Sequence, residues 1–238
     1  MIYSAEQAAA ASATGLDNPT LALNVSPPRD YEPGLQFLDL MKMMRPWKAP
    51  TESGDKLNVD ELQERGLLDA DGWPTDLPAD VDEFQALWQW NNLPQEAEAH
   101  KGIYVLKYEG DGTLELSGDA RILSSEPGRI VFENETGSNF RLHITATDPE
   151  QNGDYLKNIS IVAEEHEALH DAGGVFNPDW LKLVEDAREL RFMSWMDTNS
   201  STLTDWDEMQ SADGPNTGAM RSVEHMVQLA NETGADPW

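Results

Sequence analysis

Residues 102–162 alternate apolar and polar side chains with a period of two, and this alternation constrains the fold more than any other feature of the sequence. Gly-Asp and Pro-Gly turns separate the short apolar runs at about the 8–12-residue spacing that is typical of a β-sandwich. The runs are 103–106, 114–116, 122–123, 130–132, 140–144 and 159–162. The sequence therefore predicts an antiparallel all-β module in the middle of the chain.

The two ends of the chain follow a different pattern, in which strands alternate with helices. The elements expected there are helices at 35–41, 177–184 and 220–230, strands at 20–26 and 190–196, and a turn into a further strand at 234–238. Alternating strands and helices favour a parallel sheet. Because the β module interrupts this α/β pattern, we expect the module to be an insertion.

The charge balance excludes several classes of partner. The chain has 44 acidic and 16 basic residues, which gives a formal net charge of −28. Such a surface repels nucleic-acid phosphates and anionic lipids, so neither is an expected partner. Dense carboxylates are compatible with solubility at high salt, where charges are screened, and carboxylate oxygens also suit calcium. The sequence leaves both interpretations of the acidic surface open.

Two absences narrow the chemistry further. The chain contains no cysteine, which excludes disulfides, thiolate metal sites and a cysteine nucleophile. No apolar run approaches the roughly 18 residues that are needed to cross a bilayer, so we expect no membrane span. The Ala-rich start of the chain lacks the charged and apolar regions of an intact signal peptide.

Several short motifs occur in an order that resembles one group of proteins. The motifs are LRFMSWMDTN at 190–199, RPW at 45–47, DGWP at 71–74, GDA at 118–120, PGRI at 127–130, ITATDP at 144–149 and GADPW at 234–238. Together they resemble bacterial exported proteins that look like clan A glycoside hydrolases, which have a (β/α)8 barrel and two catalytic glutamates.

The resemblance implies an α/β plus all-β fold with an inserted module. On this interpretation residues 20–48 and 175–238 form the first strands and helices of a (β/α)8-type barrel. Residues 49–174 are an inserted antiparallel β-sandwich module with its connectors, and residues 1–19 are a flexible N-terminal segment. The resemblance also implies an extracellular or cell-surface location.

The catalytic glutamates of such barrels cannot be located in this sequence. In clan A enzymes the acid/base glutamate follows the fourth strand in an Asn-Glu pair, and the nucleophile follows the seventh. Here Asn134-Glu135 lies in a turn of the β module, and Asn231-Glu232 ends a predicted helix. We therefore name no catalytic residue, leave open whether the chain is an enzyme, and expect it to continue in a longer polypeptide or to be completed by another chain.

The resemblance points to sugar-binding residues at the carboxyl ends of the first two strands, where such barrels carry their active sites. The candidates are Asn24, Arg191, Trp195, Asp197, Asn199 and Trp206. Amides and carboxylates can hydrogen-bond sugar hydroxyls, and an indole can stack on a pyranose ring. The alternatives are that Arg191 pairs with a buried carboxylate and that Trp206 packs against its neighbours in a capped, solvated loop.

Three other motifs have a structural and a functional interpretation. The run from His166 to His170 fits the zinc-protease pattern H-E-x-x-H, but Phe176 stands at the usual position of the third ligand. Asp69 and Asp71 resemble part of a calcium loop, although a structural turn is favoured because the loop is incomplete. Trp88 and Trp90 are expected to pack in the core rather than to form a sugar platform.

These observations lead to one leading hypothesis and one alternative. The leading hypothesis is an extracellular carbohydrate-active protein, the N-terminal portion of a glycoside-hydrolase-like barrel that uses two carboxylates and retains configuration if the missing part is present. The alternative is a non-catalytic carbohydrate-binding or structural protein of a surface or appendage. The expected ligand is a polysaccharide or oligosaccharide, and no cofactor and no metal are expected.

Overall fold

The computed structural model describes residues 21–93, 96, 98–218 and 222–238, and it divides into two compact units. The two-sheet unit comprises residues 29–175 and 213–218. The parallel-sheet unit comprises the described parts of residues 1–28, 176–212 and 219–238. The N-terminal segment that is predicted to be flexible, residues 1–19, lies outside the described residues.

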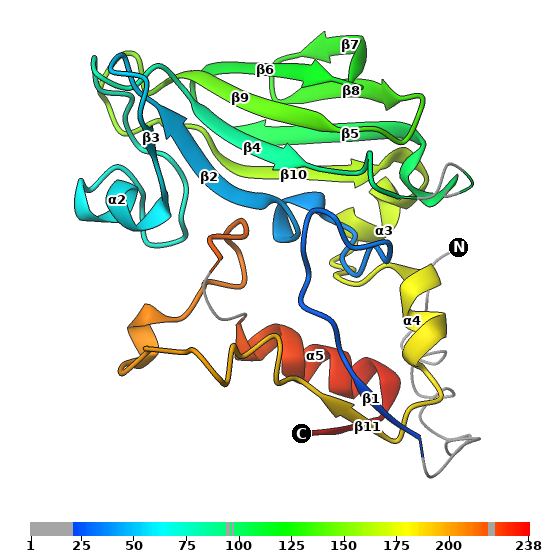
Figure 1. Ribbon diagram of the computed structural model, residues 1–238. Helices are drawn as coiled ribbons and strands as arrows, with labels where there is room; N and C mark the ends of the chain where they lie inside the picture. The colour runs from blue at the N-terminus through cyan, green and yellow to red at the C-terminus, as the bar shows by residue number, and fades with distance from the viewer. Residues whose placement is uncertain (1–20, 94–95, 97, 219–221) are drawn as a thin grey trace. The chain divides into compact units, whose positions relative to one another are not determined.

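The two-sheet unit contains two antiparallel sheets (Figure 1). The five-stranded sheet has the order β3-β2-β4-β9-β6 and the four-stranded sheet the order β10-β5-β8-β7. The strands are β2 (Arg45–Pro50), β3 (Lys56–Leu57), β4 (Phe84–Trp88), β5 (Gly102–Glu109), β6 (Gly112–Gly118), β7 (Arg121–Glu126), β8 (Arg129–Asn134), β9 (Phe140–Thr147) and β10 (Lys157–Ala163). Strands β5 to β10 confirm the antiparallel all-β prediction for residues 102–162.

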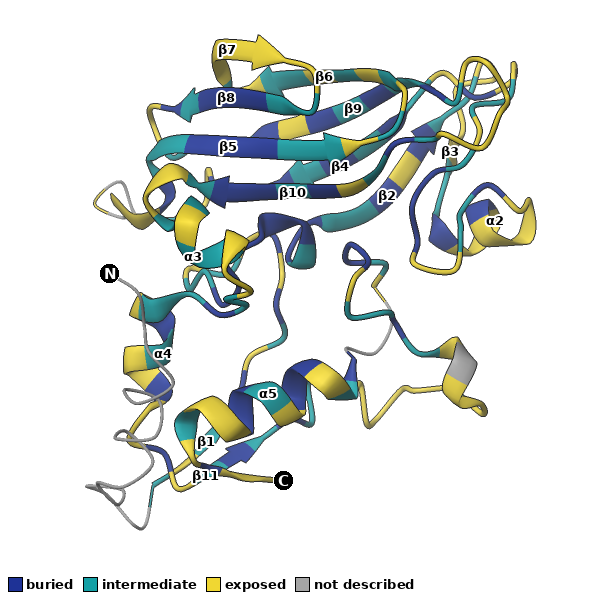
Figure 2. Ribbon diagram, turned by 180° about the vertical axis from the view of Figure 1, so that it is seen from behind, coloured by how far each residue is buried: buried dark blue, intermediate teal, exposed yellow. Residues whose placement is uncertain are grey.

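Aromatic side chains from both sheets meet in one core. Trp88 of β4 stacks on Phe140 of β9 with ring centroids 4.5 Å apart, and Phe140 lies 5.4 Å from Phe132 of β8. Because successive strand residues point to opposite faces, β9 alternates buried apolar residues with outward-facing polar residues. Figure 2 shows this alternation as dark bands along the strands. Trp88 and Trp90 are both buried, which confirms the prediction that they pack in the core.

A buried carboxylate joins the start of the two-sheet unit to β10. Asp39 caps the 3-10 helix η1 (Leu40–Lys42) by accepting from the Met41 amide at 2.9 Å, and it also accepts from the Ile161 amide at 3.0 Å. Burial raises the pKa of Asp39, and the positive charge of Lys42 opposes that shift. The prediction of a helix over residues 35–41 was wrong, because only this single turn forms.

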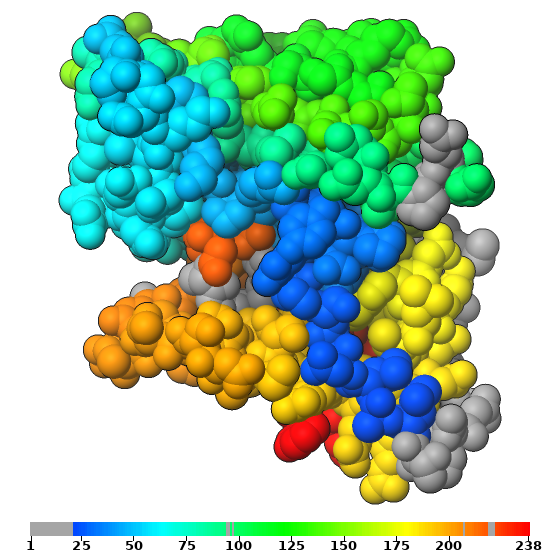
Figure 3. Space-filling view, in the orientation of Figure 1, coloured from blue at the N-terminus to red at the C-terminus, as the bar shows by residue number. Residues whose placement is uncertain are grey.

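Residues 213–218 return to the same part of the two-sheet unit. The Asn216 amide donates to the Met41 carbonyl at 2.8 Å, and the Lys42 ammonium donates to the carbonyls of Asp213 and Gly214 at 2.8 Å. In Figure 3 this orange segment lies against the blue residues near the start of the unit. One backbone hydrogen bond and two hydrogen bonds from the Lys42 side chain therefore attach residues 213–218 to the start of the two-sheet unit.

Short helices complete the connections of the two-sheet unit. They are α2 (Val59–Glu64), η2 (Glu98–His100), η3 (Glu164–His166) and α3 (Glu167–Asp171). Asn58 and Glu61 form a reciprocal capping box at the start of α2, in which each side chain accepts from the other residue's backbone amide. Two orphan donors of the first helical turn are thereby satisfied.

The parallel-sheet unit contains three short strands in the order β1-β11-β12. They are β1 (Ala22–Asn24), β11 (Glu189–Arg191) and β12 (Asp236–Pro237), and both pairings are parallel. Its helices are α4 (Pro178–Val184), η4 (Trp206–Glu208) and α5 (Val223–Thr233). The predicted parallel α/β pattern is therefore present, and the described strands form no closed barrel. No helix among the described residues is long and apolar enough to cross a membrane.

The predicted strand at 190–196 is wrong beyond Arg191. The amides of Trp195 and Met196 both donate to the Phe192 carbonyl at 2.9 Å, which turns the backbone immediately after the strand. Asp197 then adopts a left-handed conformation with a φ of 44°. Arg191 and Trp195 consequently do not lie on one strand, although their spacing in the sequence suggested that they do.

Candidate functional site

The register of the parallel sheet brings two of the predicted sugar-binding residues together. Asn24 of β1 lies directly opposite Arg191 of β11, and the Val25 amide extends this pairing by donating to the Arg191 carbonyl at 3.0 Å. Residues opposite each other in a sheet point to the same face. The amide of Asn24 and the guanidinium of Arg191 are therefore neighbours at the carboxyl ends of two parallel strands.

Trp238 adds an aromatic ring to this row. The Trp238 amide donates to the Leu190 carbonyl at 2.9 Å, and the Trp238 carbonyl accepts from the Phe192 amide at 2.8 Å. These two bonds place Trp238 opposite Arg191, whose guanidinium carbon lies 4.7 Å from the centre of the indole ring. Because Trp238 remains 71% exposed, much of the indole is open for another contact. Sequence reasoning missed Trp238 as a site residue.

A second row of side chains lies two residues earlier on each strand. Ala22 is opposite Glu189, and Glu189 is opposite Asp236. Because side chains repeat every second residue along a strand, this row shares its face with Asn24 and Arg191. The sequence does contain a signal for these two rows. Glu189 and Arg191, like Asp236 and Trp238, are two residues apart, which is the spacing of side chains on one face of a strand. We call the five polar and aromatic residues of the two rows, which are Asn24, Glu189, Arg191, Asp236 and Trp238, the sheet-face site.

The opposite face of the parallel sheet packs in the core of its unit. Leu190 is fully buried, as is Leu229 of α5, and Met226 is nearly so. Figure 2 shows the buried stripe of α5 in dark blue, with exposed residues on its other side. The face of the sheet that α5 covers is apolar. The side chains that could hydrogen-bond a ligand therefore lie on the other face, in the sheet-face site.

Trp195 is a core residue of the parallel-sheet unit. Its side chain is 1% exposed, and its ring centroid lies 5.4 Å from that of Phe192 and 6.4 Å from that of Phe176. Its indole N–H donates to the Ser26 carbonyl at 2.8 Å. This burial leaves no face of the Trp195 indole open to a sugar.

The remaining predicted residues lie on the connection between β11 and α5. The Asp197 carbonyl accepts from the amides of Ser200 and Ser201 at 2.9 and 2.8 Å, and Asn199 in the same turn is exposed. Trp206 begins η4 and is 65% exposed. Figure 1 shows η4, in orange, apart from β1 and β11. The sheet register therefore pairs Asn24 with Arg191, whereas Asp197, Asn199 and Trp206 follow on the connection that leaves β11.

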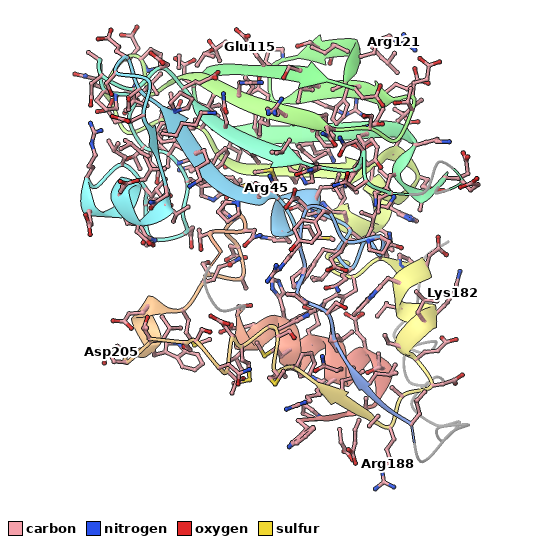
Figure 4. All side chains as sticks on the ribbon, viewed as in Figure 1. Arg45, Glu115, Arg121, Lys182, Arg188 and Asp205 are labelled. Atoms are coloured by element: carbon pink, nitrogen blue, oxygen red, sulfur yellow. The ribbon has the colours of Figure 1, made fainter. Side chains whose placement is uncertain are left out.

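The η4 turn holds Trp206 on an anchored backbone. The Glu208 carboxylate accepts from the amides of Thr204 and Asp205 at 2.8 and 3.4 Å. These backbone hydrogen bonds lower the pKa of Glu208. Asp205, labelled in Figure 4, marks this exposed turn. Trp206 is thus presented to solvent, and at 65% exposure it does not fit the alternative in which it packs against its neighbours.

The H-E-x-x-H motif is part of an ion-pair cluster of the two-sheet unit. Glu167 lies 2.9 Å from the Lys107 ammonium and 3.1 Å from the Arg129 guanidinium. Both partners lower the pKa of Glu167, with Arg129 having the larger effect. A carboxylate held in two ion pairs is a poor general base, because its ionised form is stabilised. The described residues contain no group of three side chains placed to hold a metal ion.

The aspartates near residue 70 support a turn, as predicted. One oxygen of Asp69 accepts from the amides of Asp71 and Trp73 at 3.0 and 2.8 Å. The other accepts from the Tyr155 hydroxyl at 2.7 Å, and this bond raises the pKa of Tyr155 to about 12. The Asp69 carboxylate therefore organises its own loop and ties it to Tyr155.

Comparison of the sequence and the structure with known proteins adds no assignment. No protein family, curated protein or solved structure matches this chain.

Proposed function

We propose that this chain is an extracellular carbohydrate-binding protein and that the sheet-face site is where it holds an oligosaccharide. The observation that carries the proposal is the row of Asn24, Arg191 and Trp238 at the carboxyl ends of three adjacent parallel strands. Ligands of parallel α/β folds bind outside the carboxyl ends of the strands. The row therefore lies where a parallel sheet ordinarily meets its ligand.

The chemistry of the sheet-face site suits a polyol. Asn24 offers both a donor and an acceptor, Arg191 offers several donors, and Glu189 and Asp236 offer acceptors. A sugar presents hydroxyls that both donate and accept, together with an apolar ring face that can cover an indole. The exposed Trp238 indole supplies that surface, and Arg191 at 4.7 Å stabilises its orientation through a cation–π contact.

The sequential order β1-β11-β12 also supports a glycoside-hydrolase-like frame. Consecutive parallel strands that are linked by helices are how a (β/α)8 barrel begins, and the antiparallel sheets would be a β-sandwich inserted after its first strand. In that frame a retaining two-carboxylate hydrolysis would require the remainder of the barrel, in a longer polypeptide or a second chain. Binding is the function that this chain's own residues support.

Titration with a panel of neutral oligosaccharides tests the proposal. We expect tryptophan fluorescence to change on binding. We expect Trp238→Ala and Asn24→Ala each to weaken the affinity roughly 5- to 30-fold, since a lost stacking or hydrogen-bonding group is worth about 1–2 kcal/mol. Leu183→Ala, which removes another exposed apolar side chain of the same unit, is the matched control. Equal affinities for Trp238→Ala and the control would contradict the proposal.

A second candidate function is a non-catalytic structural role at a surface or in an appendage. The open edge of β7 favours it, because this strand pairs only with β8 among the described strands and exposes Ile122 and Leu123. Exposed strand edges can pair with other chains. Sedimentation analysis distinguishes the two functions, because a structural role predicts assemblies of this chain that form without any sugar.

A further inference from the structure

The outer face of the five-stranded sheet carries a polar array that no motif in the sequence reveals. In β9, Phe140, Leu142 and Ile144 point into the core, whereas Arg141 and His143 point to the opposite face. The register places His143 between Gln85 of β4 and Glu115 of β6. Figure 4 labels Glu115 at this surface of β6. The array therefore has three adjacent strands beneath it as a rigid base.

Hydrogen bonds connect the side chains of Ser117, His143 and Glu83 in a line. The Ser117 hydroxyl lies 2.7 Å from Nε2 of His143, and Nδ1 of His143 lies 2.9 Å from Oε2 of Glu83. The Gln85 amide donates to the other oxygen of Glu83. The side chains of His143 and Glu83 are 16% and 21% exposed, so a small molecule can reach them.

We propose that Ser117, His143 and Glu83 form a hydrolytic triad that cleaves small carboxylic esters. A serine is a weak nucleophile until an adjacent base accepts its proton, and the base must itself be oriented by a third group. The Glu83 carboxylate accepts from Nδ1–H, which leaves the lone pair of Nε2 facing the Ser117 hydroxyl. Gln85 fixes Glu83 in turn, so each member of the triad is positioned by the next.

Arg141 places a positive charge next to the Ser117 hydroxyl. It lies directly opposite Ser117 across the β9–β6 pair, on the same face of the sheet. Among the described residues, no hydrogen bond or ion pair engages its guanidinium, and the residue is exposed. A positive charge beside the nucleophile can stabilise the negative oxygen that develops on the attacked carbonyl. Arg141 therefore takes the role of the oxyanion stabiliser.

The reaction balances with water as the only other reactant. Oγ of Ser117 attacks the ester carbonyl while its proton passes to Nε2 of His143, and the tetrahedral oxyanion forms beside Arg141. As the carbon–oxygen bond to the alcohol breaks, the alcohol leaves with the proton from Nε2. Water then attacks the acyl-serine, gives its proton to Nε2, and releases the carboxylic acid as Oγ recovers that proton.

This triad lies in the two-sheet unit and is independent of the sheet-face site. A network that only stabilises the sheet would show the same hydrogen bonds without a reactive serine. Reactivity toward an electrophile therefore separates the two roles, and a fluorophosphonate supplies that electrophile because Oγ displaces its fluoride to form a stable adduct.

The experiment incubates the full chain with a fluorophosphonate and maps the adduct by peptide mass spectrometry, alongside initial rates with p-nitrophenyl acetate. We expect one adduct on Ser117, no adduct in Ser117→Ala, and labelling of Ser117 that is slowed about 100-fold or more in His143→Gln, which lacks the base. Glu83→Gln should also slow the labelling, because it removes the carboxylate that orients the imidazole. Circular dichroism of each variant verifies that the chain is folded.

Glu115→Gln is the matched control for the carboxylate. Glu115 lies directly across from His143 on the same face, and no hydrogen bond joins it to that ring. The triad predicts that labelling of Ser117 is unchanged in Glu115→Gln and slowed in Glu83→Gln. Absence of an adduct on Ser117, an adduct only on other serines, or equal labelling in His143→Gln would each overturn the proposal.

Discussion

The two units of this protein differ in how strongly their sequences specify their strands. The two-sheet unit is made mainly of strands with five to eight residues, such as β9, in which Phe140, Leu142 and Ile144 are buried in strict alternation. The parallel-sheet unit has strands of two or three residues. A period of two needs several residues before it can be recognised, so the first unit is predictable from local pattern and the second depends on tertiary contacts.

The largest expected loss of stability comes from a substitution in the aromatic core of the two-sheet unit. Phe140→Ala removes a fully buried ring that lies 4.5 Å from Trp88 and 5.4 Å from Phe132. We expect the free energy of unfolding to fall by about 3–5 kcal/mol, because the change leaves a cavity between the two sheets. Urea unfolding followed by far-UV circular dichroism measures this loss.

Leu123→Ala on β7 is the control for that substitution. Leu123 is 43% exposed, so its truncation should change the free energy of unfolding by roughly 0.5 kcal/mol or less. Similar losses for the two variants would show that the aromatic core does not stabilise the two-sheet unit in the way described.

The second effect concerns pH and the buried His100 of the two-sheet unit. His100 is 1% exposed and lies edge-on to Trp90 at 4.7 Å, and burial lowers its pKa to about 4. Since the unfolded chain binds this proton near pH 6.5, the folded state loses stability as the pH falls from 6.5 toward 4. The loss is on the order of 3 kcal/mol, at 1.36 kcal/mol per unit of pKa difference.

The measurement is urea unfolding of the native chain and of His100→Phe at several values of pH. The difference in stability between the two should shift in favour of the variant by about 3 kcal/mol between pH 7 and pH 4. A difference that stays constant over this range would mean that folding does not change the pKa of His100, and would contradict the lowered value.

The smallest effect tests whether Trp195 belongs to the core of the parallel-sheet unit. Trp195→Phe keeps an aromatic ring but removes the N–H that donates to the Ser26 carbonyl. We expect a loss of about 1–3 kcal/mol, the cost of an unmade buried hydrogen bond. Trp206→Phe, at a position that is 65% exposed, should change stability by less than about 0.5 kcal/mol. Thermal unfolding of both variants gives the comparison, and a larger loss for Trp206→Phe would reverse these assignments.

The sequence predicted the parts of the fold that repeat a pattern over many residues. It predicted six antiparallel strands in residues 102–162, the parallel order of the terminal elements, and the burial of Trp88 and Trp90. It failed after Arg191, where apolar Phe192 and Trp195 resemble a continuing strand but lie in a turn. Both are buried, so apolar character alone could not separate a strand from a packed turn.

The candidate sites were less predictable because they depend on register. Asn24 and Arg191 are 167 positions apart, and only the β1–β11 pairing makes them neighbours. Ser117 and His143 are separated by 26 positions and His143 and Glu83 by 60, so no local motif could relate them. Trp238 was overlooked because its role follows from its contact with Arg191 rather than from its own surroundings in the sequence.

The most direct test of the account follows the indole N–H resonance of Trp238 during titration with the oligosaccharide that binds best. Two-dimensional nitrogen–proton spectra resolve the indole signals of the eight tryptophans. Replacing each tryptophan in turn by phenylalanine assigns its signal. The sheet-face site predicts that the Trp238 signal shifts progressively and saturates, while the signals of the buried Trp88, Trp90 and Trp195 stay in place. Saturable shifts that leave Trp238 unchanged and move another tryptophan would place the sugar elsewhere and contradict the central proposal.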